Sequence, residues 1–349
     1  VAPEPFDEGP DQLIGRYRFD SFVEGTTNRF ALTAARAAAE HPGVRYNPLF
    51  VYGGVGLGKT HLLHAVGHEV RRLRPGSRVL YVTSETFVND LIEAIRTHRM
   101  REFRARYREG CDVLLVDDIQ FLAGKERTQE EFFHLFNTLH SSRKQIVLSG
   151  DQVPQSIPDM EDRLRSRLQW GLITNIHPPC FETRVAILKR KAEVDHVDLP
   201  DDVAMLVARH ITRNVRELEG ALMRLEASAG IFDRPITLDL AKDVLGDLVE
   251  ESLHRVSTEQ VMKLVAQDFR VSLTDLKGPR RHRLVTVPRQ VAMFLVRKLT
   301  EHSLPQIGQA FGGRDHTTVI NAVRRVEQRR AADPDFRKRV EALDRQLTG

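Results

Sequence analysis

The sequence contains little cysteine, no long apolar run and no internal repeat. Its two cysteines, Cys111 and Cys180, lie far apart and without metal-ligand spacing, which argues against a disulfide scaffold or a zinc module and favours a reducing cytosol. No segment approaches the roughly 18 apolar residues of a membrane-spanning helix, and no signal peptide opens the chain. With 41% hydrophobic residues, the composition is that of globular domains.

Charge is unevenly divided along the chain. From Leu253 onward there are 19 Lys and Arg against 10 Asp and Glu, a net charge of +9, so the total of +4 leaves −5 for the preceding residues. A basic C-terminal module on a slightly acidic body favours a polyanion as the partner of that module. A solvated basic face would give the same balance, so charge alone does not decide between the two.

A length of 349 residues predicts two or three domains. Residues 1–15 are rich in proline, glycine and acids and are predicted to be a linker remnant; because the chain begins with Val1, we expect a piece of a longer one. Residues 16–178 alternate short apolar runs with helical patterns, which predicts a three-layer α/β domain with a parallel sheet. The predicted strands are 49–52, 79–83, 113–116, 145–149 and 172–176, and the predicted helices between them include 59–72, 86–108 and 128–142.

After the two prolines at 178–179 the pattern is helical throughout. Four predicted helices make a small subdomain over residues 179–248. They are 182–194, 201–210, 215–230 and 238–245. The basic remainder, residues 249–349, is predicted to be a separate all-helical domain.

Residues 53–60 (GGVGLGKT) fit the phosphate-binding pattern G-x-x-x-x-G-K-[ST], between a predicted strand and a predicted helix as the pattern requires. Glycines allow backbone N–H groups to turn toward phosphates at a helix N-terminus. Lys59 is predicted to bind the β- and γ-phosphates of ATP, and the Thr60 hydroxyl to bind Mg²⁺. The glycines of the loop are Gly53, Gly54, Gly56 and Gly58. A glycine-rich turn that holds no ligand is the alternative.

Two acids end the third predicted strand, downstream of the phosphate loop. Asp117 is predicted to hold Mg²⁺ through water, and Asp118 to polarise the water that attacks ATP. Acids often end strands, so the pair alone is a weak signal. Following a phosphate loop, it is typical of an ATPase of this class.

Three further residues are candidates for sensing the nucleotide. Asp151 follows the fourth predicted strand, where ATPases of this layout place a residue that senses the γ-phosphate; otherwise it is a turn residue. Arg163 and Arg167 share one helix face, either as a salt-bridged surface or with an arginine that reaches a neighbouring subunit's ATP. Arg216, near the start of a helix, either points to the phosphates or pairs with an acid.

Together these motifs resemble those of the DnaA family of bacterial chromosomal replication initiators, AAA+ ATPases with a C-terminal helix-turn-helix DNA-binding domain. The likeness covers residues 17–325 and depends on the joint occurrence of five segments. They are YNPL at 46–49 with the phosphate loop, LLVDDIQFL at 114–122, EDRLRSR at 161–167, NVRELEGAL at 214–222 and FGGRDHTTV at 311–319. Members of the family also carry an N-terminal interaction domain, which we do not find in this sequence.

The resemblance implies a role for each matching position. The positions that match nucleotide- and Mg²⁺-binding residues are Val23, Lys59, Thr60, His61 and Asp117. Asp118 matches the second acid of the strand motif, and its short side chain fits a slow ATPase used as a switch. Asp151 matches the first sensor, Arg167 the arginine finger that acts in trans, and Arg216 the second sensor. Gly150 departs from the family, in which Ser is more usual.

The stretch at 311–319 predicts the turn and the recognition helix of a helix-turn-helix. Ser303 is predicted to cap a short helix with Pro305 in its first turn, and two glycines then end that helix. The apolar residues predicted to bury the two helices are Ile307, Ala310, Phe311, Val319, Ile320 and Val323. The residues predicted to be exposed at the start of the second helix, where base edges are read, are Arg314, Asp315, His316, Thr317 and Thr318.

A basic loop at 277–283 (KGPRRHR) is either a solvated charge run or a further DNA contact. The resemblance points to Arg281 as the residue that enters the minor groove, although Pro279 replaces a more usual basic residue. The residues implied to bind phosphates, which set register without reading sequence, are Arg289, Gln290 and Arg314.

The resemblance implies an ATP-controlled initiator that binds repeated duplex sites at the origin, assembles with ATP into a helical oligomer, opens the strands and is switched off by slow hydrolysis. It implies single-stranded DNA contacts at Ile92 and Arg127, contacts with the replicative helicase, regulators and acidic phospholipids, and a place at the nucleoid in the cytoplasm. Two alternatives belong to other classes. One is an AAA+ transcription activator, whose aromatic-Thr-Gly loop we do not find, and the other is a nucleotide-gated repressor that does not hydrolyse ATP.

Overall fold

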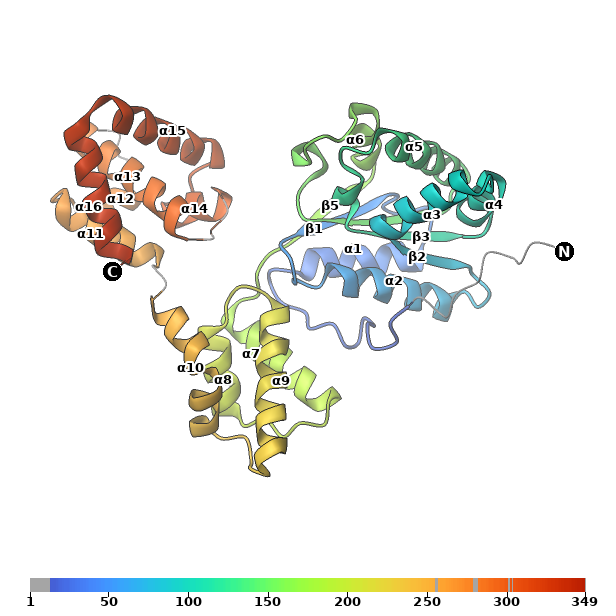
Figure 1. Ribbon diagram of the computed structural model, residues 1–349, viewed down its shortest axis with the longest axis horizontal. Coiled ribbons are helices and arrows are strands. Elements are labelled where there is room, and N and C mark those ends of the chain that lie inside the picture. Colours follow the sequence, from blue (N-terminus) through green and yellow to red (C-terminus); the bar gives the residue numbers. More distant parts are fainter. Residues whose placement is uncertain (1–12, 255–256, 279–281, 301, 303, 349) are drawn as a thin grey trace. The chain divides into compact units, whose positions relative to one another are not determined.

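The computed structural model describes residues 13–348 except 255–256, 279–281, 301 and 303. The chain divides into two compact units, Val1–Gly246 and Asp247–Gly349. The N-terminal unit contains a five-stranded sheet, and every described element of the C-terminal unit is a helix (Figure 1). The division falls two residues before the boundary expected at 248/249.

The sheet is wholly parallel, in the order β2-β3-β4-β1-β5. Its strands are β1 (Leu49–Gly53), β2 (Val79–Thr83), β3 (Val113–Asp117), β4 (Gln145–Gly150) and β5 (Leu172–Ile176). Each begins at the predicted residue and ends within one residue of the predicted end. The central strands β3 and β4 are buried along their whole length, because helices cover both faces of a parallel sheet. The predicted α/β class is confirmed.

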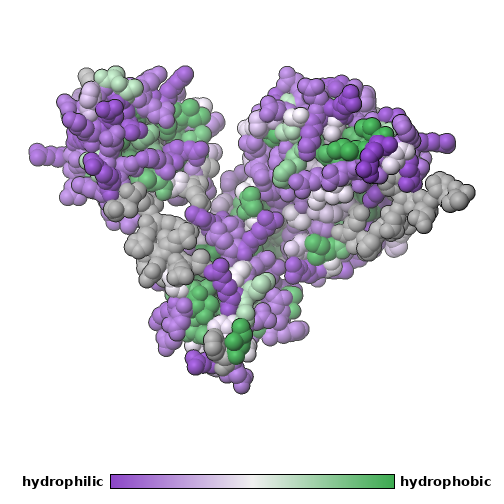
Figure 2. Space-filling view, in the orientation of Figure 1, coloured by the Kyte–Doolittle hydropathy of each residue, from purple (hydrophilic) through white to green (hydrophobic). Residues whose placement is uncertain are grey.

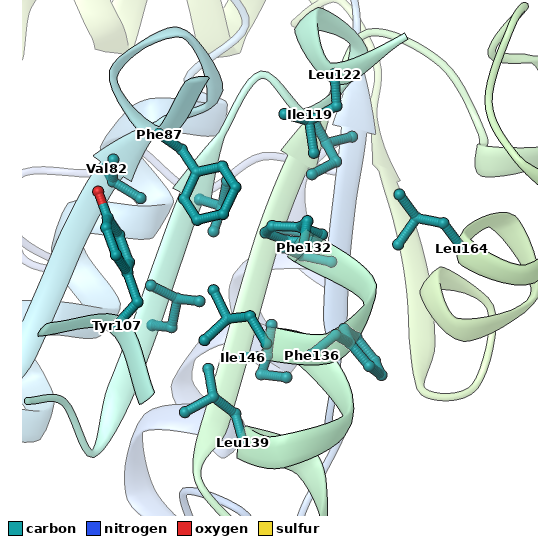
Figure 3. Packing of buried hydrophobic residues seen from close by; sticks show 14 of the residues in the cluster. Val82, Phe87, Tyr107, Ile119, Leu122, Phe132, Phe136, Leu139, Ile146 and Leu164 are labelled. Atoms are coloured by element: carbon teal, nitrogen blue, oxygen red, sulfur yellow. The ribbon is translucent and has the colours of Figure 1, made fainter. Parts of the chain in front are cut away.

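Successive residues of the strands point to opposite faces, and each face has its own core. Leu49, Val51 and Leu115 pack against the helices of one face. Phe87 and Phe132 pack with the strand residues of the other face (Figure 3). The first face is covered by α1 (Arg29–Glu40) and α2 (Lys59–Leu73), and the second by α3 (Ser84–Arg96), α5 (Glu126–Ser141) and α6 (Asp162–Leu168).

The single helix predicted at 86–108 is wrong. The chain leaves α3 after Arg96, re-enters a helix in α4 (Met100–Arg104) and continues as a wider π turn over Ala105–Glu109. The Thr97 hydroxyl donates a hydrogen bond of 2.7 Å to the carbonyl of Glu93, and His98 adopts a left-handed conformation with φ 58°. The left-handed turn at His98 ends α3, although the flanking residues favour a helix.

The helical subdomain contains the four predicted helices. They are α7 (Phe181–Val194), α8 (Asp201–His210), α9 (Val215–Phe232) and α10 (Leu238–His254). The last of them is longer than the predicted 238–245 and crosses the division between the two units. Gly246 costs about 1 kcal/mol relative to alanine in a helix interior and does not end the helix.

The C-terminal unit is built of six helices in its described part. They are α11 (Thr258–Asp268), α12 (Leu273–Lys277), α13 (Arg283–Leu299), α14 (Leu304–Ala310), α15 (His316–Ala332) and α16 (Pro334–Thr348). Val291 and Leu295 of α13 form the centre of one apolar core with Phe311 and Val319. These residues of α13 are therefore core, and they orient the helix-turn-helix that follows.

Hydrophilic residues cover most of the surface of both units in the view of Figure 2. Within the described part of the chain, no helix combines the length and apolar character needed to cross a membrane. The exposed apolar side chains include Trp170, at 51% exposure, and Ile92, at 57%. Both lie in the N-terminal unit.

Candidate functional site

The phosphate-binding loop connects β1 to α2. Gly56 and Gly58 have φ angles of +73° and +98°, a left-handed region that is strained for any other residue type. Gly58 is the N-cap of α2 and has no side chain to bind the first-turn N–H groups. The loop therefore directs backbone donors and the positive end of the α2 dipole toward one point, which suits an anion.

Lys59 is folded back along this loop. Only 6% of its surface is exposed, and its Nζ donates to the carbonyls of Gly53 at 2.8 Å and Gly54 at 3.1 Å. The same Nζ forms an ion pair of 2.8 Å with Asp151, which follows β4. The structure thus brings together two predicted site residues that are 92 positions apart in sequence.

The Asp117 carboxylate at the end of β3 is buried and accepts hydrogen bonds from three hydroxyl groups. Thr60 donates at 2.6 Å and Tyr81 at 3.0 Å, and Ser149 donates a short third bond. Burial and the neighbouring Asp117 charge raise the pKa of Tyr81 above its usual value, so its hydroxyl stays a donor. The charged carboxylate is therefore held in one orientation.

Asp118 has a left-handed backbone, with φ 56° and ψ 57°. Its N–H donates to Ser149 Oγ at 2.8 Å, which fixes this strained turn at the edge of the sheet. Gln120 donates to both Asp118, at 3.2 Å, and Asp151, at 3.0 Å. Burial, and next the Asp117 charge, raise the pKa of Asp118 above that of a free aspartate, as expected of a carboxylate that accepts protons.

Lys59, Thr60, Asp118 and Asp151 line a cavity of about 400 Å³ between the sheet edge and the helical subdomain. Asn214 caps α9, accepting from Glu217 N at 2.8 Å. Directly after it, Val215 N donates to the carbonyl of Gly56 at 2.9 Å, so the start of α9 sits on the phosphate loop. The predicted residues that line the cavity are Val23, Gly56, Gly58, Lys59, Thr60, His61, Asp118, Asp151 and Arg216. Gly53, Gly54 and Asp117 contact this lining through Lys59 and Thr60.

One end of the cavity is aromatic. Tyr17 stacks on His61 with ring centroids 4.8 Å apart, and Phe22 meets the same ring edge-on at 5.2 Å. Burial lowers the pKa of His61 to about 4, so the imidazole is neutral at physiological pH. Tyr17, Phe22 and Lys191, whose Nζ lies 6.0 Å from the Tyr17 ring centroid, also line the cavity and were not predicted as site residues. The signal was present as aromatic residues gathered in the segment before α1.

Three predicted residues lie away from the cavity lining. Arg167 is on α6, where its guanidinium lies over the ring of Trp170, 3.7 Å from the centroid. Ile92 is exposed on α3, and Arg127 is exposed in the first turn of α5. Ile92 and Arg127 are therefore accessible to other molecules, and Arg167 is half-buried.

The helix-turn-helix comprises α14, a glycine turn and α15. Gly312 and Gly313 have φ angles of +90° and +73°, and a Cβ on Gly312 would lie 2.1 Å from the carbonyl oxygen of Lys277. The residues exposed at the start of α15 are Asp315, His316, Thr317 and Thr318. Asp315 is the N-cap and accepts from Thr317 N at 2.8 Å. One predicted anchor is wrong: Ile320 is 45% exposed, because the core is reached through Val319.

The phosphate contact predicted for Arg289 does not fit its position. Arg289 is 5% exposed, and its guanidinium donates to three backbone carbonyls after and within α12. They belong to Asp275 at 2.6 Å, Leu276 at 2.7 Å and Gly278 at 2.9 Å. Arg314 donates to Gly278 as well, and Gln290 is half-buried. Arg281 lies outside the described residues.

Arg289→Ala is expected to destabilise the C-terminal unit by about 3 kcal/mol, because each buried carbonyl left without a donor costs about 1–3 kcal/mol. Hydrogen exchange should show faster opening of α11, α12 and α13 while the sheet is unaffected. Arg297→Ala on the exposed side of α13 is the matched control, with an expected change below about 0.5 kcal/mol. Equal hydrogen-exchange protection in the two variants would show that Arg289 is not needed for stability and would favour the predicted phosphate contact.

The geometry defines the class of protein. The N-terminal unit is a P-loop ATPase domain of the AAA+ class, with a phosphate loop, an acidic strand end and a helical lid around one cavity. The C-terminal unit is a helix-turn-helix DNA-binding domain. The family described as bacterial DnaA ATPase domain matches residues 13–175, and the family described as bacterial DnaA helix-turn-helix matches residues 258–326.

The chain belongs to the DnaA family of bacterial chromosomal replication initiators. It is 48% identical over 335 residues to the chromosomal replication initiator protein DnaA of Geobacter sp. (strain M21), covering 96% of this chain and 73% of that relative. Domain III of the Thermotoga maritima initiator superposes with a TM-score of 0.67 at 45% identity, over 68% of this chain and 99% of that one. A replication initiator DnaA bound to AMPPCP and single-stranded DNA superposes with a TM-score of 0.64 at 36% identity, over 97% and 99%.

Proposed function

We propose that the protein is an ATP-controlled origin initiator that binds repeated duplex sites, assembles with ATP, opens the strands and is switched off by slow hydrolysis. One observation carries the switch: Val215 N donates to Gly56 O, which places Arg216 of the lid at the cavity beside the phosphate loop. A change at the phosphates therefore acts on the lid through direct contact. The relative bound to AMPPCP and single-stranded DNA supports both ligands.

The site residues divide the work on ATP. Lys59 and the loop N–H groups bind phosphates, while Val23 and His61 lie toward the base. The oxygens of Thr60 and Asp117, 2.6 Å apart, are the ligand type that Mg²⁺ prefers. When bound, Mg²⁺ neutralises charge on the β- and γ-phosphates. Asp118 orients and polarises the attacking water, and Asp151 senses the γ-phosphate.

Assembly uses residues outside the cavity. Arg167 reaches the ATP of a neighbouring subunit and makes the oligomer depend on the γ-phosphate. Ile92 and Arg127, both exposed, contact single-stranded DNA held by the helical oligomer. The replicative helicase, its regulators and acidic phospholipids are further partners, and the protein acts at the nucleoid. The helix-turn-helix recognises the duplex sites by sequence, through base contacts of His316 and Thr318.

A footprint on the organism's own origin DNA tests the proposal. With ADP, we expect protection of isolated duplex sites only. With ATP, we expect protection to spread between the sites and unpaired bases to become reactive to permanganate. Identical footprints with the two nucleotides would contradict an ATP-controlled initiator. A wild-type chain with no ATP turnover would instead favour a nucleotide-gated repressor.

His316→Ala and Thr318→Ala are each expected to weaken binding to a cognate duplex by about 1–3 kcal/mol relative to random duplex, the usual value of a lost base contact. Both side chains are exposed at the start of α15, where recognition helices meet base edges. Titrations at one salt concentration with cognate and random duplexes measure the ratio. Gln328→Ala, exposed near the other end of α15, is the control. Equal losses on both duplexes would show that these residues bind only the backbone.

A further inference from the structure

Arg167 differs from the other arginines of α6 in having no acidic partner. Arg163 pairs with Glu161 at 2.5 Å, and Arg165 pairs with Asp162 at 2.6 Å. Arg167 has no ion pair and no side-chain hydrogen bond to any residue that the structure describes, and its Nε is buried without a partner. Among the described residues, its positive charge therefore has no acidic partner.

Aromatic rings hold Arg167 instead. Its guanidinium carbon lies 3.7 Å from the ring centroid of Trp170 and 5.5 Å from that of Phe133. Trp170 is the only tryptophan of the chain. Since the distance to its ring is the shorter by far, Trp170 supplies the main cation–π contact.

Trp170 is itself fixed from α5. The ring of His140 meets it at 5.2 Å, and His140 stacks in turn on the buried Phe136 at 5.8 Å. The backbone N–H of Trp170 donates to the carbonyl of Arg167 at 3.2 Å, so the two residues lie in one turn at the C-terminal end of α6. The indole is half-exposed, at 51%, and it is anchored to the core on one side.

Stacking uses the face of a guanidinium and leaves the N–H groups of its two terminal nitrogens, Nη1 and Nη2, available, although Nε of Arg167 is buried. Those groups are the ones that bind a phosphate in bidentate fashion. A stacked arginine also has fewer rotamers to lose on binding, so less of the interaction energy is spent on ordering it. An unpaired arginine held by its face is thus prepared for an anion that comes from outside the subunit.

We propose that Trp170 is the positioning residue of Arg167 and that the two form one unit of the subunit interface, which presents the guanidinium edge to the triphosphate bound by the next subunit. The inference rests on the proposed trans role of Arg167. It adds that the role depends on an indole at position 170. Trp170 itself makes no contact with the phosphates.

The full chain with Trp170→Leu, which keeps apolar volume but removes the ring, tests the inference. We expect the protein concentration needed for ATP-dependent assembly, measured by native mass spectrometry, to rise about tenfold. The affinity of the monomer for ATP should not change. Trp170→Phe should restore most of the loss, since a smaller ring remains. Phe30→Leu is the matched control, because Phe30 is an exposed aromatic of α1 at 64% exposure.

Arg167→Ala separates failure of the inference from failure of the proposed function. If Arg167→Ala assembles normally, the trans role is wrong and both fall. If Arg167→Ala does not assemble while Trp170→Leu does, only the inference is overturned. If Trp170→Leu does not fold, wild-type fluorescence decides: the single indole should change its emission when ATP assembles the chains, and an unchanged emission would overturn the proposal.

Discussion

Lys59→Ala is expected to weaken ATP binding by about 100-fold or more, because each charge-assisted hydrogen bond contributes about 1.5–3 kcal/mol. Among the lysines that the structure describes, Lys59 alone is buried. It lines the cavity from the first turn of α2. Its donors now bind Gly53, Gly54 and Asp151. Phosphate oxygens at the same place would replace these acceptors.

Calorimetric titration with ATP and with ADP measures this effect. Lys242→Ala on the lid surface, where the side chain is 61% exposed, is the matched control and should bind ATP normally. Duplex binding by the C-terminal unit should survive in both variants, since its core is complete without the sheet. Retention of full ATP affinity by Lys59→Ala would mean that the loop N–H groups bind the phosphates unaided.

The sequence predicted those parts of the site whose residues all lie in one short segment. The phosphate loop needs a strand end, particular glycines and a helix start, and residues 53–60 contain all three. The signal for the five strands was equally local, because a short apolar run between two helical patterns is typical of a strand in a parallel sheet. The order of the strands is not local. Tyr81 and Ser149 reach Asp117 only because β2 and β4 flank β3.

Arg289 shows the opposite limit. In the sequence it resembles Arg314 or any other basic residue of a DNA-binding module, yet the fold buries it under α12 against backbone carbonyls. A charged side chain goes inside only when its partners are in place, and those partners lie 11 to 14 residues away. Ile320 is the opposite case, a residue predicted to be buried that is exposed. Helical periodicity does not tell which neighbour of Val319 faces the core.

Asp118→Asn is expected to leave ATP binding intact and to slow hydrolysis by about 100-fold or more, the usual contribution of a general base. The amide keeps the size of the side chain but takes no proton from water. Asp118 is suited to the task because burial and the Asp117 charge raise its pKa, and Gln120 holds it beside Asp151. The ATP-bound assembly should consequently outlive that of the wild type.

Single-turnover kinetics measure the rate of hydrolysis. Native mass spectrometry after dilution measures the lifetime of the assembled state. Asp112→Asn, on a surface carboxylate that pairs with Arg78, is the matched control for removing one negative charge. If Asp118→Asn hydrolyses ATP at the wild-type rate, then Asp151 becomes the group to test next, since it shares Gln120 with Asp118. If hydrolysis stops but the assembly dissociates as before, hydrolysis does not set the lifetime of the oligomer, which contradicts the switch.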